Sequence, residues 1–379
     1  MALSYIGGKF AKTEFLYSHC PEKIHYKTLV LNFSGVGWLF LKQDFSHCEK
    51  VVFNDINPYL INMLKAFTES ERFLEEFGYY MEEGKELYLN PEETLQEARL
   101  RFFNLYKNWN EELFKKIINL DEVDYTAAVQ FAFLISHSFS ARHPKRAGFN
   151  FKSEKTTHPN FMRIINKLKK NEYGDLLKKV KFESLDFEQC FKKYDARDTF
   201  FYTDPPYWLC ESDYDVDNDK FGLYGHIRLS RAMQQMEGRI MLSYYNFPYL
   251  DSFYPSRTFA RAQESFHKPS CNFKAVKERG QEVIVMNYNS EGRLHCWDRE
   301  SSEPIETYLE IAGLEAPPMH IRRTRKSYST NFKRIIVDLI EMGVKKAELM
   351  RRFKIGSYAT LKRWQMKYST PDEGLRLAA

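Results

Sequence analysis

Long apolar runs, paired cysteines and an apolar leader are all missing from this sequence. No stretch approaches the roughly 18 consecutive apolar residues that a membrane-spanning helix needs. The opening residues MALSYIGGKFAK contain no apolar core of a signal peptide. The six cysteines show no C-x-x-C pair or other spacing typical of metal ligands. We therefore expect no export, no membrane insertion, no metal site, and reduced thiols in the cytoplasm of a bacterial or phage-infected cell.

Net charge is low for the whole chain but high near its C-terminal end. The 379 residues carry a formal net charge of +5 and are 43% apolar, which suits a globular protein of roughly two or three domains. Between His320 and Tyr368, 14 Lys and Arg stand against 3 Asp and Glu, so the rest of the chain is acidic overall. Such a basic segment is typical of an appended nucleic-acid-binding unit, and a solvated basic surface is the alternative.

The N-terminal part has the pattern of a nucleotide-binding strand, helix and strand. Residues 29–33 (LVLNF) and 50–55 (KVVFND) read as strands. Between them lies a turn with Gly35 and Gly37, followed by an apolar stretch suited to a helix. Glycines let the backbone approach a ligand, and Asp55 could accept hydrogen bonds from ribose hydroxyls. This arrangement predicts cofactor binding.

Strands and helices then alternate around one helical insert. Helical spacing dominates from about Glu71 to Leu120 and returns at residues 125–136, and a basic segment with turn residues follows at 137–160. The sequence predicts further strands at 180–184, 199–204, 239–245, 257–263 and 282–288. The last two suggest an antiparallel hairpin at the sheet edge. The order predicts an α/β fold with one insert.

The stretch FFYTDPPYW, residues 200–208, predicts a buried strand that ends on an acid. Pro205 and Pro206 cannot donate to a sheet ladder, so the strand must stop beside them. Asp204 is thereby placed at the carboxyl end of a central strand, where open α/β sheets bind ligands. A turn acid without a function is the alternative for an isolated Asp-Pro pair.

Beyond Pro317 and Pro318 the pattern changes to three short helices. Apolar residues with helical spacing follow a candidate N-cap at Thr330, and Gly343 ends that helix. A second helix follows, and Ser357 could cap a third. The pattern is that of a trihelical helix-turn-helix unit, and a simple structural bundle is the alternative. Candidate DNA contacts on the outward face of the third helix are Tyr358, Thr360, Lys362 and Arg363.

Four ordered motifs resemble those of the Dam-type DNA adenine N6-methyltransferases, the D12 class or α-group. They are YIGGK (5–9), FSGVG (33–37), NDINPYLINMLKAF (54–67) and TDPPYW (203–208). The resemblance covers about residues 1–290. It implies a Rossmann-like methyltransferase sheet, S-adenosyl-L-methionine as the methyl donor and double-stranded DNA as the substrate. It divides the chain into a catalytic domain (1–70 and 177–311), a helical target-recognition insert (71–176, with a basic hairpin at 137–160) and the C-terminal helix-turn-helix domain (320–379).

The resemblance also implies a cofactor pocket. Its candidate residues are Tyr5, Gly7, Gly8, Lys9, Phe33, Gly35, Gly37, Asp55, Asp186 and Phe187. In the family, the lysine of the first motif lies near the DNA, so Lys9 is also a candidate DNA contact, but on sequence alone it could hold a surface ion pair. Asp186 could accept a hydrogen bond from the cofactor's adenine amino group or cap a helix.

The chemistry expected of the TDPPYW motif follows from its residues. The exocyclic N6 of adenine is a poor nucleophile because its lone pair is delocalised into the ring, so hydrogen-bond acceptors must orient the amino group. The Asp204 carboxylate and the Pro205 carbonyl could both accept, and they would stabilise the positive charge that develops on nitrogen. Pro205 and Pro206 stiffen the turn. Tyr207 then offers a face on which a base taken out of the duplex could stack.

Target recognition is expected from the basic hairpin. The best-known GATC-specific relatives carry an NR-G-NG type hairpin, whereas this chain has SFSARHPKRAGFNF. The hairpin is retained, but the residues expected to contact bases differ, so the DNA sequence that is recognised stays open. Candidate DNA contacts, to guanine edges or to phosphates, are Arg142, Lys145, Arg146 and Lys152.

Two other functions stay open at the level of sequence. An RNA adenine methyltransferase would use a similar turn, and a DNA-binding regulator could have lost its activity. The basic hairpin and the intact motifs weigh against them. A cytosine N4 enzyme would more often have Ser in place of Asp204. A cognate restriction endonuclease is a further candidate partner.

Overall fold

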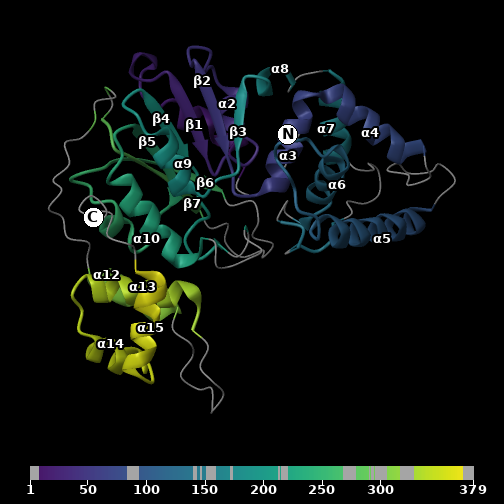
Figure 1. Ribbon diagram of the computed structural model, residues 1–379. Coiled ribbons are helices and arrows are strands. Elements are labelled where there is room, and N and C mark those ends of the chain that lie inside the picture. Colours follow the sequence, from purple (N-terminus) through teal and green to yellow (C-terminus); the bar gives the residue numbers. More distant parts are fainter. Residues whose placement is uncertain are drawn as a thin grey trace, which may run out of the picture.

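A sheet of seven strands forms the centre of the described part of the protein, seen here in a computed structural model (Figure 1). The structure describes residues 8–82, 94–139, 143–145, 147–150, 159–170, 174–211, 214, 221–267, 279–289, 291, 294, 305–315 and 328–369. The strands are β1 (Thr28–Asn32), β2 (Lys50–Asn54), β3 (Val180–Glu183), β4 (Thr199–Thr203), β5 (Arg239–Tyr245), β6 (Ala260–His267) and β7 (Arg279–Met286).

The strand order is β3-β2-β1-β4-β5-β7-β6. The first five strands in this order are parallel, whereas β7 runs antiparallel to both β5 and β6. Asn32 is in register with Asn54 on one side and Thr203 on the other. The residues that follow β1, β2 and β4 therefore emerge at the same edge. The predicted α/β fold with a terminal antiparallel hairpin is confirmed.

The bounds of β1 to β5 follow the predictions to within one residue, whereas those of β6 and β7 differ by two to four residues. β7 spans Arg279–Met286 instead of 282–288. β6 spans Ala260–His267 instead of 257–263. The preceding residues form a turn, in which the N–H groups of Thr258 and Phe259 both donate to the Pro255 carbonyl at 2.9 Å. A backbone committed to this turn cannot also pair with β7.

The helices account for most of the remaining described residues. They are η1 (Phe10–Lys12), α1 (Thr13–Tyr17), η2 (Lys23–His25), α2 (Trp38–Lys42), α3 (Pro58–Thr68), α4 (Ser70–Glu82), α5 (Leu95–Leu113), α6 (Tyr125–Ser136), α7 (Pro159–Lys169), α8 (Gly174–Leu177), α9 (Phe187–Tyr194), α10 (Gly222–Met233), α11 (Leu250–Phe253), α12 (Ile305–Glu315), α13 (Thr330–Glu341), α14 (Lys346–Phe353) and α15 (Tyr358–Tyr368). Within the described ranges, none of these helices has the length and apolar character needed to span a bilayer.

Each face of the sheet contributes to its own apolar core. Alternate residues of a strand point to opposite faces, so Leu29 and Leu31 of β1 join one core while Val30 joins the other. The first core continues into helices α3 to α7, and the second continues through α9, α10 and α12 into the C-terminal helices. The two additions to the sheet are thus built on opposite faces of it.

Helix α6 anchors the helices inserted between β2 and β3. It is apolar almost all round and is buried along most of its length, as expected for a central helix. The Asp124 side chain caps it by accepting from the Ala127 N–H at 2.9 Å. Asn62 of α3 exchanges hydrogen bonds with the Asp124 backbone, at 2.8 and 2.9 Å, which ties α6 to α3.

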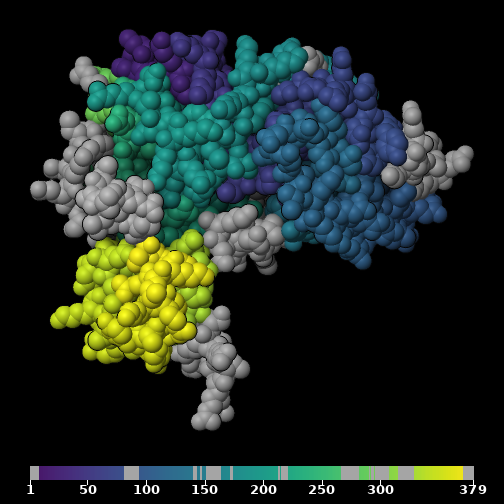
Figure 2. Space-filling model, viewed as in Figure 1, coloured from purple at the N-terminus to yellow at the C-terminus, as the bar shows by residue number. Residues whose placement is uncertain are grey.

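The C-terminal helices α13 to α15 form a lobe, seen in yellow at the bottom of the molecule in Figure 2. The predicted N-cap at Thr330 is wrong by one residue: Ser329 has an extended backbone, and its hydroxyl accepts from the Phe332 N–H at 2.9 Å. Gly343 follows α13 with a φ of 93°, which glycine adopts without strain. Ser357 caps α15 as predicted.

This lobe is docked on α10 through α13. Asp338 of α13 is buried and lies 3.0 Å from the Arg231 guanidinium of α10. At the start of α10, a Cβ on Gly222 would lie 1.9 Å from the Asn331 side chain. Phe332 and Ile335 of α13 are fully buried. Helix α13 is therefore part of the core beneath the sheet as well as the first helix of the lobe.

Candidate functional site

A cavity of about 400 Å³ lies at the carboxyl ends of β1, β2 and β4. Its walls include these predicted residues: Gly8, Lys9, Phe33, Gly35, Gly37, Lys145, Asp55, Asp186, Phe187, Asp204 and Pro206. The predicted residues Tyr5 and Gly7 lie outside the described ranges. The glycine turn, the second-strand acid and the TDPPYW acid therefore share one cavity.

The turn after β1 has a backbone that few residues accept. Phe33, Gly35 and Gly37 have positive φ angles of 57°, 52° and 73°. For Phe33 this conformation is strained, and such strain is common at functional sites. At Gly37 a Cβ would lie 2.2 Å from the Phe53 ring of β2. Close packing of the turn against β2 thus requires glycine at position 37. This is a second reason for glycine, besides the close approach of the backbone to a ligand that the sequence suggested.

Replacement of Gly37 by alanine should destabilise the protein by about 1–3 kcal/mol, because the new methyl group meets Phe53 and the φ angle is unfavourable. Urea unfolding measures this change. Gly78→Ala is the matched control, since Gly78 lies within α4 and an added Cβ has no atom within 4 Å. Helix propensity should make that change stabilising by up to about 1 kcal/mol. Wild-type stability of Gly37→Ala would contradict the packing argument.

Asp55 joins the ends of β1 and β2. One carboxylate oxygen accepts from the Gly35 N–H and the other from the Asn57 N–H, both at 3.0 Å. Burial raises the pKa of Asp55 to about 6, while these two backbone hydrogen bonds act to lower it. A carboxylate has further lone pairs. Asp55 can therefore hold the glycine turn and also accept from a ligand hydroxyl.

An asparagine pair that sequence reasoning missed ties the strand ends together. The side-chain amide of Asn54 donates to Oδ1 of Asn32 at 2.9 Å. Oδ1 of Asn54 accepts from the Leu185 N–H at 2.8 Å. The Asn32 amide donates to the Phe187 carbonyl at 3.2 Å. These bonds position the loop that carries Asp186. The sequence feature that could have indicated this pair is an asparagine as the last residue of each of the two apolar strands, β1 and β2.

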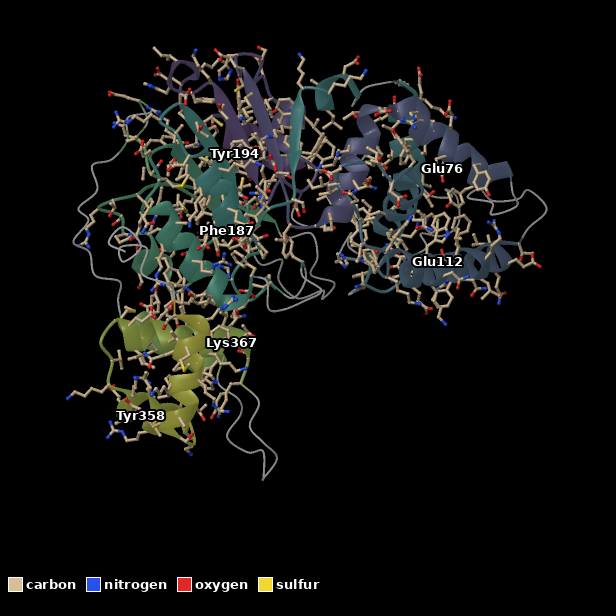
Figure 3. All side chains as sticks on the ribbon, viewed as in Figure 1. Glu76, Glu112, Phe187, Tyr194, Tyr358 and Lys367 are labelled. Carbon is tan, nitrogen blue, oxygen red and sulfur yellow. The ribbon has the colours of Figure 1, made fainter. Side chains whose placement is uncertain are left out.

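Asp186 lies at the cavity and caps α9. Its carboxylate accepts from the Glu188 N–H at 3.0 Å and pairs with the Arg228 guanidinium of α10 at 2.7 Å. Phe187 (Figure 3) stacks on Phe33, with ring centroids 5.4 Å apart. The helix cap, one of the two alternatives for Asp186, is thus present, and its contact with a cofactor stays a prediction. Arg228 was missed because nothing near it in the sequence points to Asp186.

Asp204 begins the turn after β4. Its backbone N–H donates to the Asn32 carbonyl at 3.2 Å, which holds the turn against the end of β1. Its carboxylate lies 2.9 Å from the Lys9 ammonium. Burial raises the pKa of Asp204 to about 6, with Lys9 acting to lower it and Glu282 to raise it. Asp204 is therefore ionised at neutral pH, at a wall of the cavity.

Lys9 is buried between two acids. Its ammonium lies 2.9 Å from Asp204 and 3.4 Å from Glu282, and its side chain is 10% exposed. Burial acts to lower the pKa of Lys9, but the two carboxylates outweigh this and raise the pKa well above its usual value. The ion pair allowed by the sequence exists, but its placement on the surface was wrong. It joins the first motif to the TDPPYW motif.

Tyr207 is covered in this conformation. It is 3% exposed, and its ring stacks on Tyr244 with centroids 5.5 Å apart. The Lys9 ammonium lies 4.5 Å from the centroid of the same ring and also contacts the hydroxyl. Stacking of a base on Tyr207 stays a prediction, and it requires Lys9 to move.

Glu282 of β7 and Ser243 of β5 complete this cluster and were missed by sequence reasoning. The Glu282 carboxylate accepts from the Tyr207 hydroxyl at 2.6 Å and from the Ser243 hydroxyl. Its side chain is 2% exposed. The available signal was an acid at the head of the apolar stretch EVIVMNY.

The candidate DNA contacts lie in two regions. Of the hairpin residues, Lys145 is exposed and lines the cavity, whereas Arg142, Arg146 and Lys152 lie outside the described ranges. On α15, Tyr358, Lys362 and Arg363 are exposed and Thr360 is half-buried. Figure 3 shows Tyr358 on the end of the lobe that points away from the sheet. Their contact with DNA stays a prediction.

Comparison with known families agrees with the geometry of the cavity. A family model described as D12 class N6 adenine-specific DNA methyltransferase matches residues 5–270, which is more than half of the chain. A search of curated proteins finds no match. The C-terminal lobe lies beyond the matched residues. The chain belongs to the D12 class of N6 adenine-specific DNA methyltransferases, and it methylates adenine in DNA with S-adenosylmethionine as the methyl donor.

Proposed function

We propose that this enzyme is site-specific and methylates N6 of an adenine that has been flipped out of double-stranded DNA. The observation that carries the proposal is the cavity shared by Asp204, Gly35 and Asp55. The Asp204 carboxylate, which can accept from an amino group, lies in this cavity together with the glycine turn and Asp55, which can accept from the hydroxyls of a nucleoside. Both reactants can thus meet in one place.

The residues around the glycine turn fit S-adenosylmethionine. Asp55 has lone pairs beyond its two backbone hydrogen bonds, as the binding of ribose hydroxyls requires. The stacked Phe33 and Phe187 rings supply apolar surface for an adenine ring. When bound, the donor supplies a methyl group made electrophilic by its sulfonium charge. We propose that it is held by Gly8, Phe33, Gly35, Gly37, Asp55, Asp186 and Phe187.

Asp204 and the Pro205 carbonyl orient the amino group of the target adenine. Each accepts a hydrogen bond from one of the two N–H groups of the amino group. This turns the N6 lone pair toward the methyl carbon. As the new bond to carbon forms and the carbon–sulfur bond breaks, positive charge develops on N6. The charged Asp204 stabilises this state more than the neutral amine. The surplus proton then passes from N6 to the Asp204 carboxylate and on to water, which restores a neutral amine.

Base flipping follows from the position of Asp204. Its side chain is only 15% exposed, and an adenine stacked within a duplex cannot reach it unless the nucleotide rotates outward. Unstacking costs a few kcal/mol, and stacking on an aromatic ring offsets about 1–3 kcal/mol of that. Tyr207 is the first candidate for this ring. Tyr214, which lines the cavity and was missed by sequence reasoning, is the second.

DNA recognition is assigned to the insert and the C-terminal lobe. The basic hairpin is closed by the bridge between Ser138 and Phe149, and it places Lys145 at the cavity. A cation there suits the phosphates beside a flipped base. The lobe exposes Lys362 and Arg363 on α15, a helix that could enter a groove.

The direct test is transfer of labelled methyl groups to unmethylated duplex DNA and, in parallel, to RNA, followed by mass spectrometry of the nucleosides. We expect N6-methyladenine in DNA. Label in RNA alone would favour an RNA enzyme, and DNA binding without any transfer would favour a silent regulator. Long-read sequencing of DNA from cells that express the chain would give the recognition sequence. A restriction endonuclease that cuts this sequence would then be the expected partner.

A further inference from the structure

Lys9 lies against the Asp204 carboxylate, at the point of the cavity where the proposed target adenine would bind. Its ammonium is 2.9 Å from the Asp204 carboxylate, the group expected to accept from the adenine amino group. It also lies 4.5 Å from the centroid of the Tyr207 ring. An ammonium and an amino group are both hydrogen-bond donors, so the two compete for Oδ1 of Asp204, the oxygen that Lys9 contacts. An adenine amino group that binds this oxygen therefore displaces Lys9 from it.

A buried ammonium cannot simply lose its partner. Breaking a buried ion pair leaves an uncompensated charge, which is strongly unfavourable. The Lys9 side chain is 10% exposed, between 15% for Asp204 and 2% for Glu282, so little water reaches its ammonium to take the place of a carboxylate. A second acceptor must therefore lie within reach of the Lys9 ammonium.

Glu282 meets this requirement. Its carboxylate lies 3.4 Å from the Lys9 ammonium, and it is held by the hydroxyls of Tyr207 and Ser243. The two acids differ in their access to the cavity: Asp204 is one of the cavity-lining residues, whereas Glu282 lies behind, on β7. Glu282 is thus placed to bind Lys9 without competing for the substrate.

We propose that Glu282 is a positioning residue that takes the Lys9 ammonium from Asp204 when the flipped adenine enters. The exchange frees Oδ1 of Asp204 for N6. It keeps Lys9 paired throughout, and it leaves the cluster with one net negative charge to face the positive charge on N6. This inference rests on the proposed role of Asp204 as the acceptor for the adenine amino group.

The test compares Glu282→Gln with Glu264→Gln. Glu264 lies directly opposite Glu282 in the β6–β7 register, but it is 45% exposed and pairs with Lys12 at the protein surface. We expect Glu282→Gln to lower kcat about tenfold or more, with KM for the methyl donor unchanged, because Lys9 stays on Asp204. Glu264→Gln should keep the wild-type kcat. Thermal unfolding of both variants shows whether each is folded.

The pH profile separates this role from simple packing. Asp204 faces Lys9, Glu282, Tyr202, Tyr207 and Tyr214. Because Asp204 must be ionised to accept, the wild-type rate should fall as the pH drops below about 6, the pKa of this group. Glu282 contributes to raising that pKa, so Glu282→Gln should move the acid limb to lower pH, and Glu282→Asp should restore it. Carbon-13 NMR of the Asp204 carboxyl, assigned by its loss in Asp204→Asn, should show the same shift without DNA or donor.

A double substitution tests the connection through Lys9. If Glu282 acts by receiving Lys9, Glu282→Gln should change kcat much less in a Lys9→Gln background than in the wild type. Equal losses in both backgrounds, or an unmoved acid limb and NMR titration, would overturn the inference. Failure of the wild type to methylate duplex DNA would instead refute the proposed function, and the NMR titration would still report on the cluster.

Discussion

Replacement of Asp204 by alanine should lower methyl transfer by about a thousandfold or more, because no charged acceptor then orients N6 or stabilises its developing charge. DNA affinity should stay nearly unchanged, since the lost carboxylate is only 15% exposed and lies in the cavity. Single-turnover transfer from labelled donor measures the first effect. Fluorescence anisotropy with a labelled duplex measures the second.

Two further variants make this result interpretable. Asp204→Asn keeps the shape and one acceptor but removes the charge, so its activity should lie between alanine and wild type. Asp198→Ala is the matched control because Asp198 is an exposed residue just before the opposite end of β4, and it should retain full activity. Turnover of Asp204→Ala at the wild-type rate would refute the catalytic role of the TDPPYW acid.

Replacement of Lys362 and Arg363 together by glutamine should weaken DNA binding about tenfold and reduce its salt dependence. Each phosphate contact contributes about 0.9 to the slope of log K against log salt, so the slope should become less steep by about 1 to 2. Both side chains are exposed on α15, on the lobe that carries Tyr358 (Figure 3). Binding measured across a salt series gives the affinity and the slope.

The control is a pair of lysines with no assigned role. Lys178 and Lys179 are exposed between α8 and β3, at the far side of the molecule from the lobe (Figure 1). Their replacement by glutamine removes the same charge and should leave the slope unaltered. An identical slope for Lys362→Gln/Arg363→Gln and wild type would count against the lobe as a DNA-binding unit.

Point substitutions test the lobe better than its deletion. Asp338 of α13 pairs with Arg231 of α10, and the Asn331 side chain packs against Gly222 at the start of α10. Removal of residues 320–379 would strip α13 from α10 and take away both contacts. Because Phe221, just before α10, lines the cavity, such a truncation would disturb catalysis as well as DNA binding.

The order of elements and the location of the cavity could be predicted from local patterns. Short continuous apolar runs identified the strands, and the residues that stop a strand or turn the chain are short-range signals. Gly35, Asp55 and Asp204 each follow a strand, and parallel strands end at one edge of a sheet. The convergence of these three residues therefore required only that their strands be parallel neighbours in one sheet, as in the Rossmann-like sheet that the family resemblance implied.

What each side chain contacts could be decided only by the tertiary structure. Lys9, Asp204 and Glu282 come from three distant segments, as do Asn32, Asn54 and Leu185, and no periodicity in the sequence indicates which of them will touch. A hydrogen bond depends on distances of a few tenths of an ångström, which packing of the whole sheet sets. For this reason the motifs alone determined that Asp204 would line the cavity, whereas only the fold showed that its carboxylate is paired with the buried Lys9.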